Sequence, residues 1–463
     1  MREPDTVGLA GHRAARERLE ADYRRIPAGQ PVRLAKRTSN LFRPREGLDV
    51  PGLDVSELDH VLSVDPERLV AQVQGMTTYE RLVDATLSVG TMPLVVPQLK
   101  TITIGGAVTG LGIESSSFRN GLPHESVREM EILTGSGEVV VARADNEHAD
   151  LFRAFPNSYG SLGYALRLEI ELERVHRFVR LRHVRFHDLD ALVAALDDVV
   201  RTRRHEGEAV GFVDGVVFSA EESYLTLGSW ADEAPSVSDY TGQEIYYRSI
   251  QRRPVDHLTA RDYLWRWDTD WFWCSRAFGV QNPRVRRLWP RRYLRSDAYS
   301  RLIRFENQHQ WAARWDQRRG RPARERVVQD VEIPIGHTAE FLRWFLSEVP
   351  IEPIWLCPLA LRDTDVSRGG WPLYPLEPGA PYVNVGFWST VAIAPGRADG
   401  DVNRAIERRV RELGGHKSLY SDSYYDEEEF WSLYGGETYA QTKKTYDPDG
   451  RLPGLYDKAV RRR

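Results

Sequence analysis

The chain has 463 residues, 41% hydrophobic and 28% charged, so it is an ordinary globular protein that is too long for one hydrophobic core. Its 63 basic and 67 acidic residues give a net charge of −4, which argues against nucleic acid as the main partner because phosphates require a basic excess. Two cysteines, Cys274 and Cys357, exclude a disulfide framework and match no zinc pattern, so we expect a reducing, cytoplasmic environment.

Residues 1–30 predict an N-terminal helix that ends before Pro27 and Gly29. They contain no apolar core with a small-residue cleavage site, and no stretch of the chain approaches the ~18 apolar residues that span a bilayer. We therefore expect a soluble protein with no transmembrane segment, and we leave a peripheral contact with a membrane open. Nothing in the sequence indicates an oligomeric state.

Residues 31–175 alternate short β-type runs with turns and one helical stretch at Thr77–Gly90, which is typical of an α+β or α/β unit. The β-type runs are HVLSV, LVAQV, PLVVP, EVVVA and ALRLEIEL. Residues 176–400 form a second unit, with a helix predicted in DLDALVAALDDVVRTRR and strands in FVRLRHVRF, AVGFVDGVVFS, SYLTLGSW, VVQDVEIPI, PIWLCPLAL and YVNVGFWSTVAIA. Residues 401–463 begin with a helix, DVNRAIERRVRELGG.

Six aromatic residues fall within eleven positions, from Tyr263 to Trp273. On a helix, Tyr263, Trp267 and Trp271 would share one face. Such a face suits an apolar substrate pocket, the core of the second unit, or a membrane-facing patch, and the core is slightly favoured.

The segment Leu94–Glu131, LVVPQLKTITIGGAVTGLGIESSSFRNGLPHESVREME, combines crowded glycines with hydroxyl side chains. Glycine permits a positive φ, which we expect at Gly106, and lets backbone N–H groups approach a diphosphate without an intervening Cβ. The pattern favours a dinucleotide cradle, although a turn-rich surface connection has a similar composition. A Rossmann fingerprint would need a third glycine after Gly110 and Gly112, and a Walker A loop would need a lysine, so neither motif fits.

The run TIGGAVTGLGIESSS, followed by NGL, resembles the FAD-binding segment of the vanillyl-alcohol-oxidase (PCMH-type) flavoproteins. Within that superfamily it is most similar to the delta(24)-sterol reductase (diminuto/seladin) group. Three more stretches carry the resemblance in the same order: NSYGSLGYALRLEIEL, IEPIWLCPLAL and GGHKSLYSDSYYDEEEFW. The resemblance covers residues 32–463, nearly the whole chain.

This resemblance implies an α+β fold: an FAD-binding PCMH-type domain of two subdomains at residues 31–175, a substrate cap at 176–400, and a segment at 401–463 that returns to the flavin domain. Covalent members carry a histidine in an early loop, and the matching stretch Arg33–Arg43 has none, so we expect noncovalent FAD. The residues expected to bind FAD are Arg37, Thr38, Ser39, Asn40, Thr103, Gly105, Gly106, Thr109, Gly110, Gly112, Glu114, Ser115, Ser116, Gly121, Gly160, Leu162, Gly163, Lys444 and Tyr446.

The resemblance also implies an FAD-dependent oxidoreductase that reduces a C=C bond of a lipid, with NADPH as electron donor. The arginine-rich, lysine-poor composition indicates an actinobacterial-type source, where sterol synthesis is rare, so a methylene-branched fatty acyl chain is expected as readily as a sterol-like alkene. The alternatives are an alcohol or alditol oxidase or dehydrogenase and, in another class, a non-catalytic lipid-binding protein. Candidate proton donors are Glu114, His416 and Tyr420, and we expect no metal site.

Overall fold

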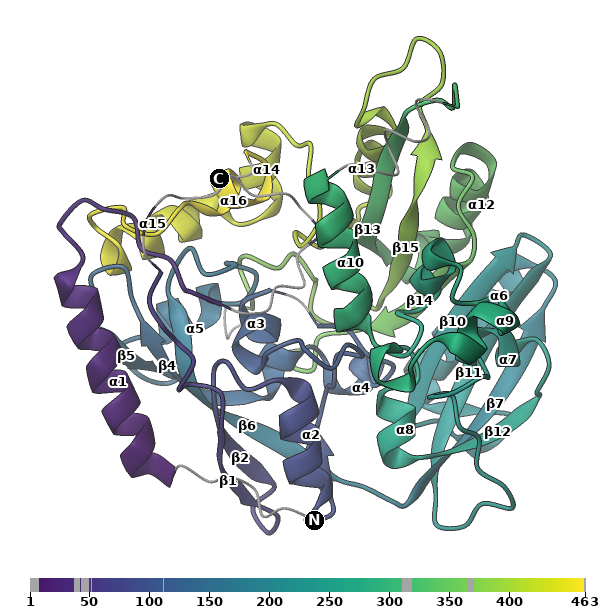
Figure 1. The fold of residues 1–463 in the computed structure, drawn as a ribbon, viewed down its shortest axis with the longest axis horizontal. Helices are drawn as coiled ribbons and strands as arrows, with labels where there is room; N and C mark the ends of the chain where they lie inside the picture. The colour runs from purple at the N-terminus through teal and green to yellow at the C-terminus, as the bar shows by residue number, and fades with distance from the viewer. Residues whose placement is uncertain are drawn as a thin grey trace.

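The structure is a computed structural model that describes residues 8–36, 42, 50, 52–110, 112–309, 319–364 and 370–461. It consists of two units, each built on an antiparallel sheet, that lie side by side (Figure 1). Within the described residues, no helix is both long and apolar enough to cross a membrane.

The first unit has a sheet in the order β1-β2-β6-β4-β5, and β3 pairs with the C-terminal end of β6. Its helix α2 begins at Thr78, whose side chain accepts a hydrogen bond from the N–H of Arg81, and buries Leu82 and Val83. The strands are β1 (Val61–Asp65), β2 (Val70–Gln74), β3 (Thr91–Pro93), β4 (Val127–Leu133), β5 (Val139–Ala142) and β6 (Tyr164–Arg174). The helices are α1 (Gly8–Arg25), α2 (Tyr79–Leu87), α3 (Ile104–Thr109), α4 (Ser117–Asn120) and α5 (Ala149–Ala154).

The second unit, the cap, has an eight-stranded sheet in the order β12-β7-β11-β10-β14-β15-β13-β16, here called the cap sheet. Its strands are β7 (Phe178–Phe186), β10 (Phe212–Ser219), β11 (Glu222–Ala231), β12 (Val255–Thr259), β13 (Arg324–Pro334), β14 (Ile354–Leu359), β15 (Tyr382–Ala392) and β16 (His416–Lys417), with a small hairpin of β8 (Arg204–His205) and β9 (Glu208–Ala209) beside it. The helices are α6 (Leu189–Thr202), α7 (Tyr246–Ile250), α8 (Ala260–Leu264), α9 (Pro283–Leu288), α10 (Ser296–His309), α12 (Thr338–Glu348) and α13 (Asp401–Glu412).

The two faces of the cap sheet have different roles, because successive side chains of a strand point to opposite faces. Val213, Val331 and Leu356 belong to a core that they share with α6, α12 and α13. Their neighbours on the opposite face include Asp214 and Cys357, and this face packs against the first unit. Any site between the two units is therefore lined by alternate residues of β10, β13, β14 and β15.

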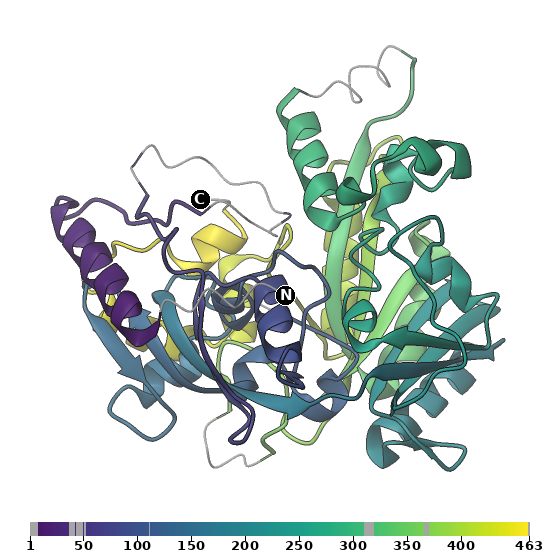
Figure 2. The same ribbon diagram turned by 60° about the horizontal axis from the view of Figure 1, so that its bottom comes forward.

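We expected the cap to end at residue 400. In the structure, the first part of the C-terminal segment still packs with the cap. Helix α13 packs on β13, and β16 pairs with β13 at Val331–Lys417 and Glu332–His416. The cap therefore extends to Lys417. Helices α14 (Glu427–Leu433), α15 (Gly436–Tyr446) and α16 (Leu455–Ala459) follow, and α15 packs against α5 of the first unit (Figures 1 and 2).

The aromatic stretch does not form the predicted helix. Helix α8 ends at Leu264, and the chain then continues in turns. Trp271 and Phe272 have φ angles of 45° and 59°, which a right-handed helix does not allow. Tyr263, Trp267 and Trp271 are nevertheless all buried, so they belong to the core, as favoured. The run PLVVP is also not a strand beyond Pro93.

Candidate functional site

The glycine-rich segment places α3 directly against the end of β2. Thr103 caps α3, and its hydroxyl oxygen accepts a hydrogen bond from the N–H of Gly106 at 3.2 Å. The N–H of Gly105 donates to the carbonyl oxygen of Gly75 at 2.9 Å, and a Cβ on Gly105 would lie 2.7 Å from that oxygen. Only glycine allows this approach.

Gly106 faces the early loop. A Cβ there would lie 2.8 Å from Oγ1 of Thr103 and 3.9 Å from Nζ of Lys36. The ammonium of the early loop thus lies near the backbone amides at the start of α3, which suits a diphosphate. Gly106 lies within α3 and has no positive φ, so the predicted positive φ was wrong. What disfavours a side chain at this position is the close contact that its Cβ would make with the Thr103 hydroxyl. Arg37, Thr38, Ser39 and Asn40 lie outside the described residues.

The end of α3 is covered by a strained turn. The N–H of Tyr159 donates to the carbonyl oxygen of Thr109 at 2.7 Å, and a Cβ on Gly110 would lie 3.3 Å from the ring of Tyr159. Asn157 and Tyr159 both have a positive φ, 63° and 50°, which is uncommon for residues other than glycine. The surrounding structure therefore holds the Tyr159 ring at the end of the cradle at a conformational cost.

Two lysines of the C-terminal segment hold this turn. Nζ of Lys458 donates to the carbonyl oxygen of Gly160 at 2.8 Å, and Nζ of Lys443 donates to that of Ser161 at 2.7 Å. Lys444, the predicted contact, is exposed on α15. Tyr446 is buried and donates from its hydroxyl group to Asp150 at 2.8 Å.

Five further predicted contacts are buried within the first unit. Oγ of Ser116 donates to the carbonyl oxygen of Leu94 at 2.9 Å. A Cβ on Gly112 would lie 2.6 Å from the ring of Pro97. Gly121 and Gly163 have φ angles of 69° and 148°, and Leu162 is fully buried in the core.

A buried charged group, here called the arginine cluster, joins the glycine segment to the cap. It consists of Glu114, Ser115, Asp214, Tyr263 and Arg266. The guanidinium of Arg266 lies 2.8 Å from Asp214 and 3.4 Å from Glu114. Glu114 also accepts from Oγ of Ser115 at 2.5 Å, and Ser115 lies 2.6 Å from the Tyr263 hydroxyl. Burial raises the pKa of Glu114, and the charge of Arg266 opposes the rise.

A second group, here called the aspartate cluster, lies on the same face of the cap sheet. It consists of Asp330, Asn384, Trp388 and Tyr420. Nδ2 of Asn384 donates to Asp330 at 3.2 Å, and Nε1 of Trp388 donates to the Tyr420 hydroxyl at 2.9 Å. Burial raises the pKa of Asp330 to about 7, while hydrogen bonds from Asn384 and Tyr420 act to lower it. Asp330 forms no ion pair with any described residue, so no cation stands ready to balance a charge on its carboxyl group.

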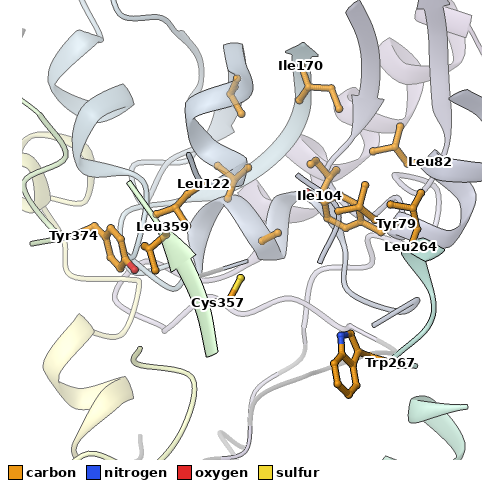
Figure 3. Close-up of a cluster of buried hydrophobic side chains, with 14 of the residues drawn as sticks. Tyr79, Leu82, Ile104, Leu122, Ile170, Leu264, Trp267, Cys357, Leu359 and Tyr374 are labelled. Atoms are coloured by element: carbon orange, nitrogen blue, oxygen red, sulfur yellow. The ribbon is translucent and has the colours of Figure 1, made fainter. Parts of the chain in front are cut away.

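Aromatic and apolar side chains fill the space around both clusters. Phe272 lies 4.4 Å from Trp388 between ring centroids, and Phe42 of the early loop stacks on Trp271 at 5.3 Å. Figure 3 shows Leu122 of the glycine segment beside Leu359 of β14, so the two units share one hydrophobic core. Both clusters therefore lie in an apolar, aromatic setting.

His416 is the third candidate proton donor, and it belongs to neither cluster but lies beside Glu332 in the β13–β16 pair. Its Nε2 is 3.6 Å from Oε2 of Glu332. Burial lowers the pKa of His416 to about 3, so the imidazole is neutral at pH 7. A neutral, buried imidazole is a poor source of protons. Among the described residues, no group of three or more His, Cys, Asp and Glu side chains is placed to hold a metal ion.

Sequence reasoning missed Asp214, Arg266, Asp330 and Asn384. Each of the three strand residues is a polar side chain among alternating apolar ones in a buried strand. That signal was present in FVDGVVFS, VVQDVEIPI and YVNVGFWST, but the sequence does not show that these strands face the glycine segment.

Known proteins support the flavin assignment. Residues 27–143 match the family model described as FAD binding domain. The chain is 27% identical to the Delta(24)-sterol reductase of Arabidopsis thaliana, over 89% of this chain and 77% of the relative, and 27% identical to that of Homo sapiens, over 86% and 75%. A shorter match, to Cytokinin dehydrogenase 9 of Oryza sativa, is 28% identical over 28% of this chain and 24% of that protein. The predicted resemblance and the α+β fold are confirmed.

Proposed function

Because this chain is an FAD-dependent oxidoreductase with a PCMH-type FAD binding domain, we propose that it reduces an isolated C=C bond of a lipid. The substrate is a methylene-branched fatty acyl chain or a sterol-like alkene, and NADPH supplies the electrons. The similarity to proteins named Delta(24)-sterol reductase over most of the chain supports reduction of an alkene. The apolar, aromatic surroundings of the two clusters support a lipid substrate.

The residues around α3 fit a bound FAD. Gly106 leaves no Cβ at the approach to the α3 amides, where Lys36 brings a positive charge, and Gly105 lets α3 pack against Gly75. These residues would hold the diphosphate, and the absence of histidine from the early loop supports noncovalent binding. Bound FAD, once reduced, supplies the hydride that an alkene reduction requires.

The observation that carries the proposal is the uncompensated acid at Asp330. An isolated alkene has no carbonyl group to polarise, so the protein must deliver a proton to one carbon as hydride reaches the other. A group with a pKa near the working pH is the best donor, and the pKa of Asp330 is about 7. Glu114 is less suited because it is held next to the permanent cation of Arg266.

Tyr420 connects Asp330 to the apolar space. Its hydroxyl group bonds to Asp330 and accepts a hydrogen bond from Trp388. We infer that Tyr420 gives its phenolic proton to the second alkene carbon while the Asp330 carboxyl group returns a proton to the phenolic oxygen. The product gains one hydride and one proton, and Asp330 is left as a carboxylate that regains a proton from solvent.

Anaerobic stopped-flow experiments test the proposed reaction. The enzyme is reduced with NADPH and mixed with a methylene-branched acyl lipid, a sterol alkene, or the saturated lipid as a control. The proposal expects the flavin to be reoxidised by an alkene and not by the saturated lipid. If no alkene reoxidises the flavin and an alditol or alcohol reduces the oxidised enzyme, the protein is an alcohol oxidase or dehydrogenase. If neither reacts, it is a lipid-binding protein.

A further inference from the structure

An exposed apolar segment runs from residue 285 to residue 305, over α9, α10 and their connection; we call it the α9–α10 segment. Among the described residues, nine large hydrophobic side chains are exposed, and five of them lie here. They are Val285, Leu288, Tyr293, Leu302 and Phe305, and Leu288 is 85% exposed. Five within twenty-one positions is a concentration, whereas the other four are scattered along the chain.

Exposed arginines alternate with these apolar residues. They are Arg287, Arg291, Arg292 and Arg301. Arg301 forms an ion pair with Asp297, and the charge of Arg291 acts on Asp239, while Arg287 and Arg292 form no ion pair with any described residue. The segment thus carries a net positive charge in a chain whose net charge is −4.

Buried contacts fix the segment in place, so its exposure is not the result of loose packing. Arg286, alone among the arginines of α9, is buried and forms two hydrogen bonds to Asp270, at 2.6 and 2.9 Å. Oγ of Ser296 donates to Asp268 at 2.6 Å, and the hydroxyl of Tyr299 donates to the carbonyl oxygen of Thr269 at 3.1 Å. The same helices therefore send one set of side chains to the core and the other to solvent.

The segment lies next to the junction of the two units. Figure 1 shows α10 between them. The guanidinium of Arg295, at the start of α10, lies 2.8 Å from Glu80 of α2 in the first unit, and Asp268 accepts a hydrogen bond from the N–H of Lys100 at 3.0 Å. A partner bound to the α9–α10 segment would thus also lie close to the junction of the two units.

We propose that the α9–α10 segment binds the surface of an anionic phospholipid bilayer. Leucine, tyrosine and phenylalanine side chains enter the boundary between headgroups and acyl chains, and the arginines contact phosphates. Apolar and cationic residues that are interspersed along one segment fit this boundary, whereas a protein interface gathers its apolar residues at the centre and its charges at the rim. This inference goes beyond the proposed reaction and does not depend on it.

Vesicle co-sedimentation tests the inference with the flavin-loaded full chain. The vesicles contain phosphatidylcholine alone or phosphatidylcholine with phosphatidylglycerol. We expect binding to the anionic vesicles, little binding to the neutral ones, and weaker binding as sodium chloride is added. Equal binding to both kinds of vesicle, or to neither, would overturn the inference.

Variants separate the charged from the apolar contribution. Replacement of Arg287, Arg291 and Arg292 by serine should weaken vesicle binding by about fivefold per arginine. Leu288→Ser should weaken it by roughly tenfold. Matched controls are Arg201→Ser on α6 and Leu9→Ser on α1, both exposed elsewhere, and these should leave binding unchanged.

Three outcomes contradict the inference. Equal losses in the control variants would show that the α9–α10 segment has no special role. Binding that depends on the arginines and not on Leu288 would indicate a polyanion or an acidic protein surface. A dimer of wild-type protein, seen by analytical ultracentrifugation and lost in Leu288→Ser, would assign the segment to a second copy of the chain. Flavin content and thermal midpoint confirm that each variant is folded.

Discussion

The two buried clusters lie on the same face of the cap sheet, yet they balance charge in different ways. In the arginine cluster, the guanidinium of Arg266 lies between Glu114 and Asp214, so both acids have a cation beside them. In the aspartate cluster, Asp330 has only neutral hydrogen-bond partners. A permanent cation beside two buried acids links the elements that carry them, whereas burial without a cation raises the pKa of Asp330 to about 7. The first cluster is thus a structural joint between the two units, and the second is the proposed proton site.

The largest effect is expected when the joint loses its cation. Arg266→Met leaves Glu114 and Asp214 buried and uncompensated, and should lower the free energy of unfolding by about 3–5 kcal/mol. Urea denaturation followed by tryptophan fluorescence measures this change. The exposed Arg201→Met is the control and should stay within about 0.5 kcal/mol of wild type. If Arg266→Met lowers the free energy of unfolding by less than about 1 kcal/mol, the charge of Arg266 does not hold the two units together.

The second largest effect is expected at the proposed proton site, where a substitution should raise the free energy of unfolding instead of lowering it. The pKa of Asp330 is raised from 3.8 to about 7, so the folded wild type binds a proton that the unfolded chain releases. Wild-type stability should therefore fall as pH rises from about 4 to 7, by up to about 4 kcal/mol. Asp330→Asn removes this dependence, so the variant gains stability relative to wild type over the same range. Parallel stability–pH curves for the two proteins would contradict a raised pKa.

A change in the cradle should disturb neither cluster. Gly106→Val forces a Cβ to within 2.8 Å of the Thr103 hydroxyl, close to Lys36, and should weaken flavin binding at least about tenfold, which is ~1.4 kcal/mol. Flavin content after purification and titration with FAD measure the loss. Gly336→Val is the control, because a Cβ on Gly336 meets nothing within 4 Å. Full flavin content in Gly106→Val would place the cradle elsewhere. In wild type, acid precipitation should release the flavin into solution.

The smallest effect is expected for Glu114→Gln. The substitution keeps the size of the side chain and its place beside Arg266, and should cost about 1 kcal/mol of stability. In the proposed mechanism the proton comes from the aspartate cluster, so the pH dependence of the reaction should stay as in wild type. A shift of the pH–rate midpoint in Glu114→Gln would mean that the two clusters have been assigned the wrong roles.

The sequence predicted those parts of the fold in which local pattern and packing agree. Helix α6 follows from leucines and valines at helical spacing, and β13 and β15 from alternating apolar residues. The helix predicted in the aromatic stretch was wrong because long-range contacts determine the backbone conformation there: Asp268 binds Ser296, and Asp270 binds Arg286. Local spacing carries no information about such partners.

The candidate site was predicted to a similar extent. The proposed cradle around Gly105 and Gly106 could be predicted because its residues are contiguous in the sequence. Of the proposed proton site, Tyr420 lies in one of the quoted motifs, but Asp330 is ninety residues earlier and was not predicted. A single acid in an apolar strand looks like any solvent-facing residue until the sheet is assembled, so its burial and raised pKa follow only from tertiary structure.

The most direct test is the pH dependence of flavin reoxidation by an alkene lipid, measured anaerobically with NADPH-reduced enzyme. In wild type, we expect the rate to fall as pH rises through about 7, because Asp330 then loses its proton. Asp330→Asn and Tyr420→Phe should each be slowed roughly 100-fold and should lose this midpoint, while Glu114→Gln keeps it. A full rate and an unchanged midpoint in Asp330→Asn would contradict the assignment of the proton site.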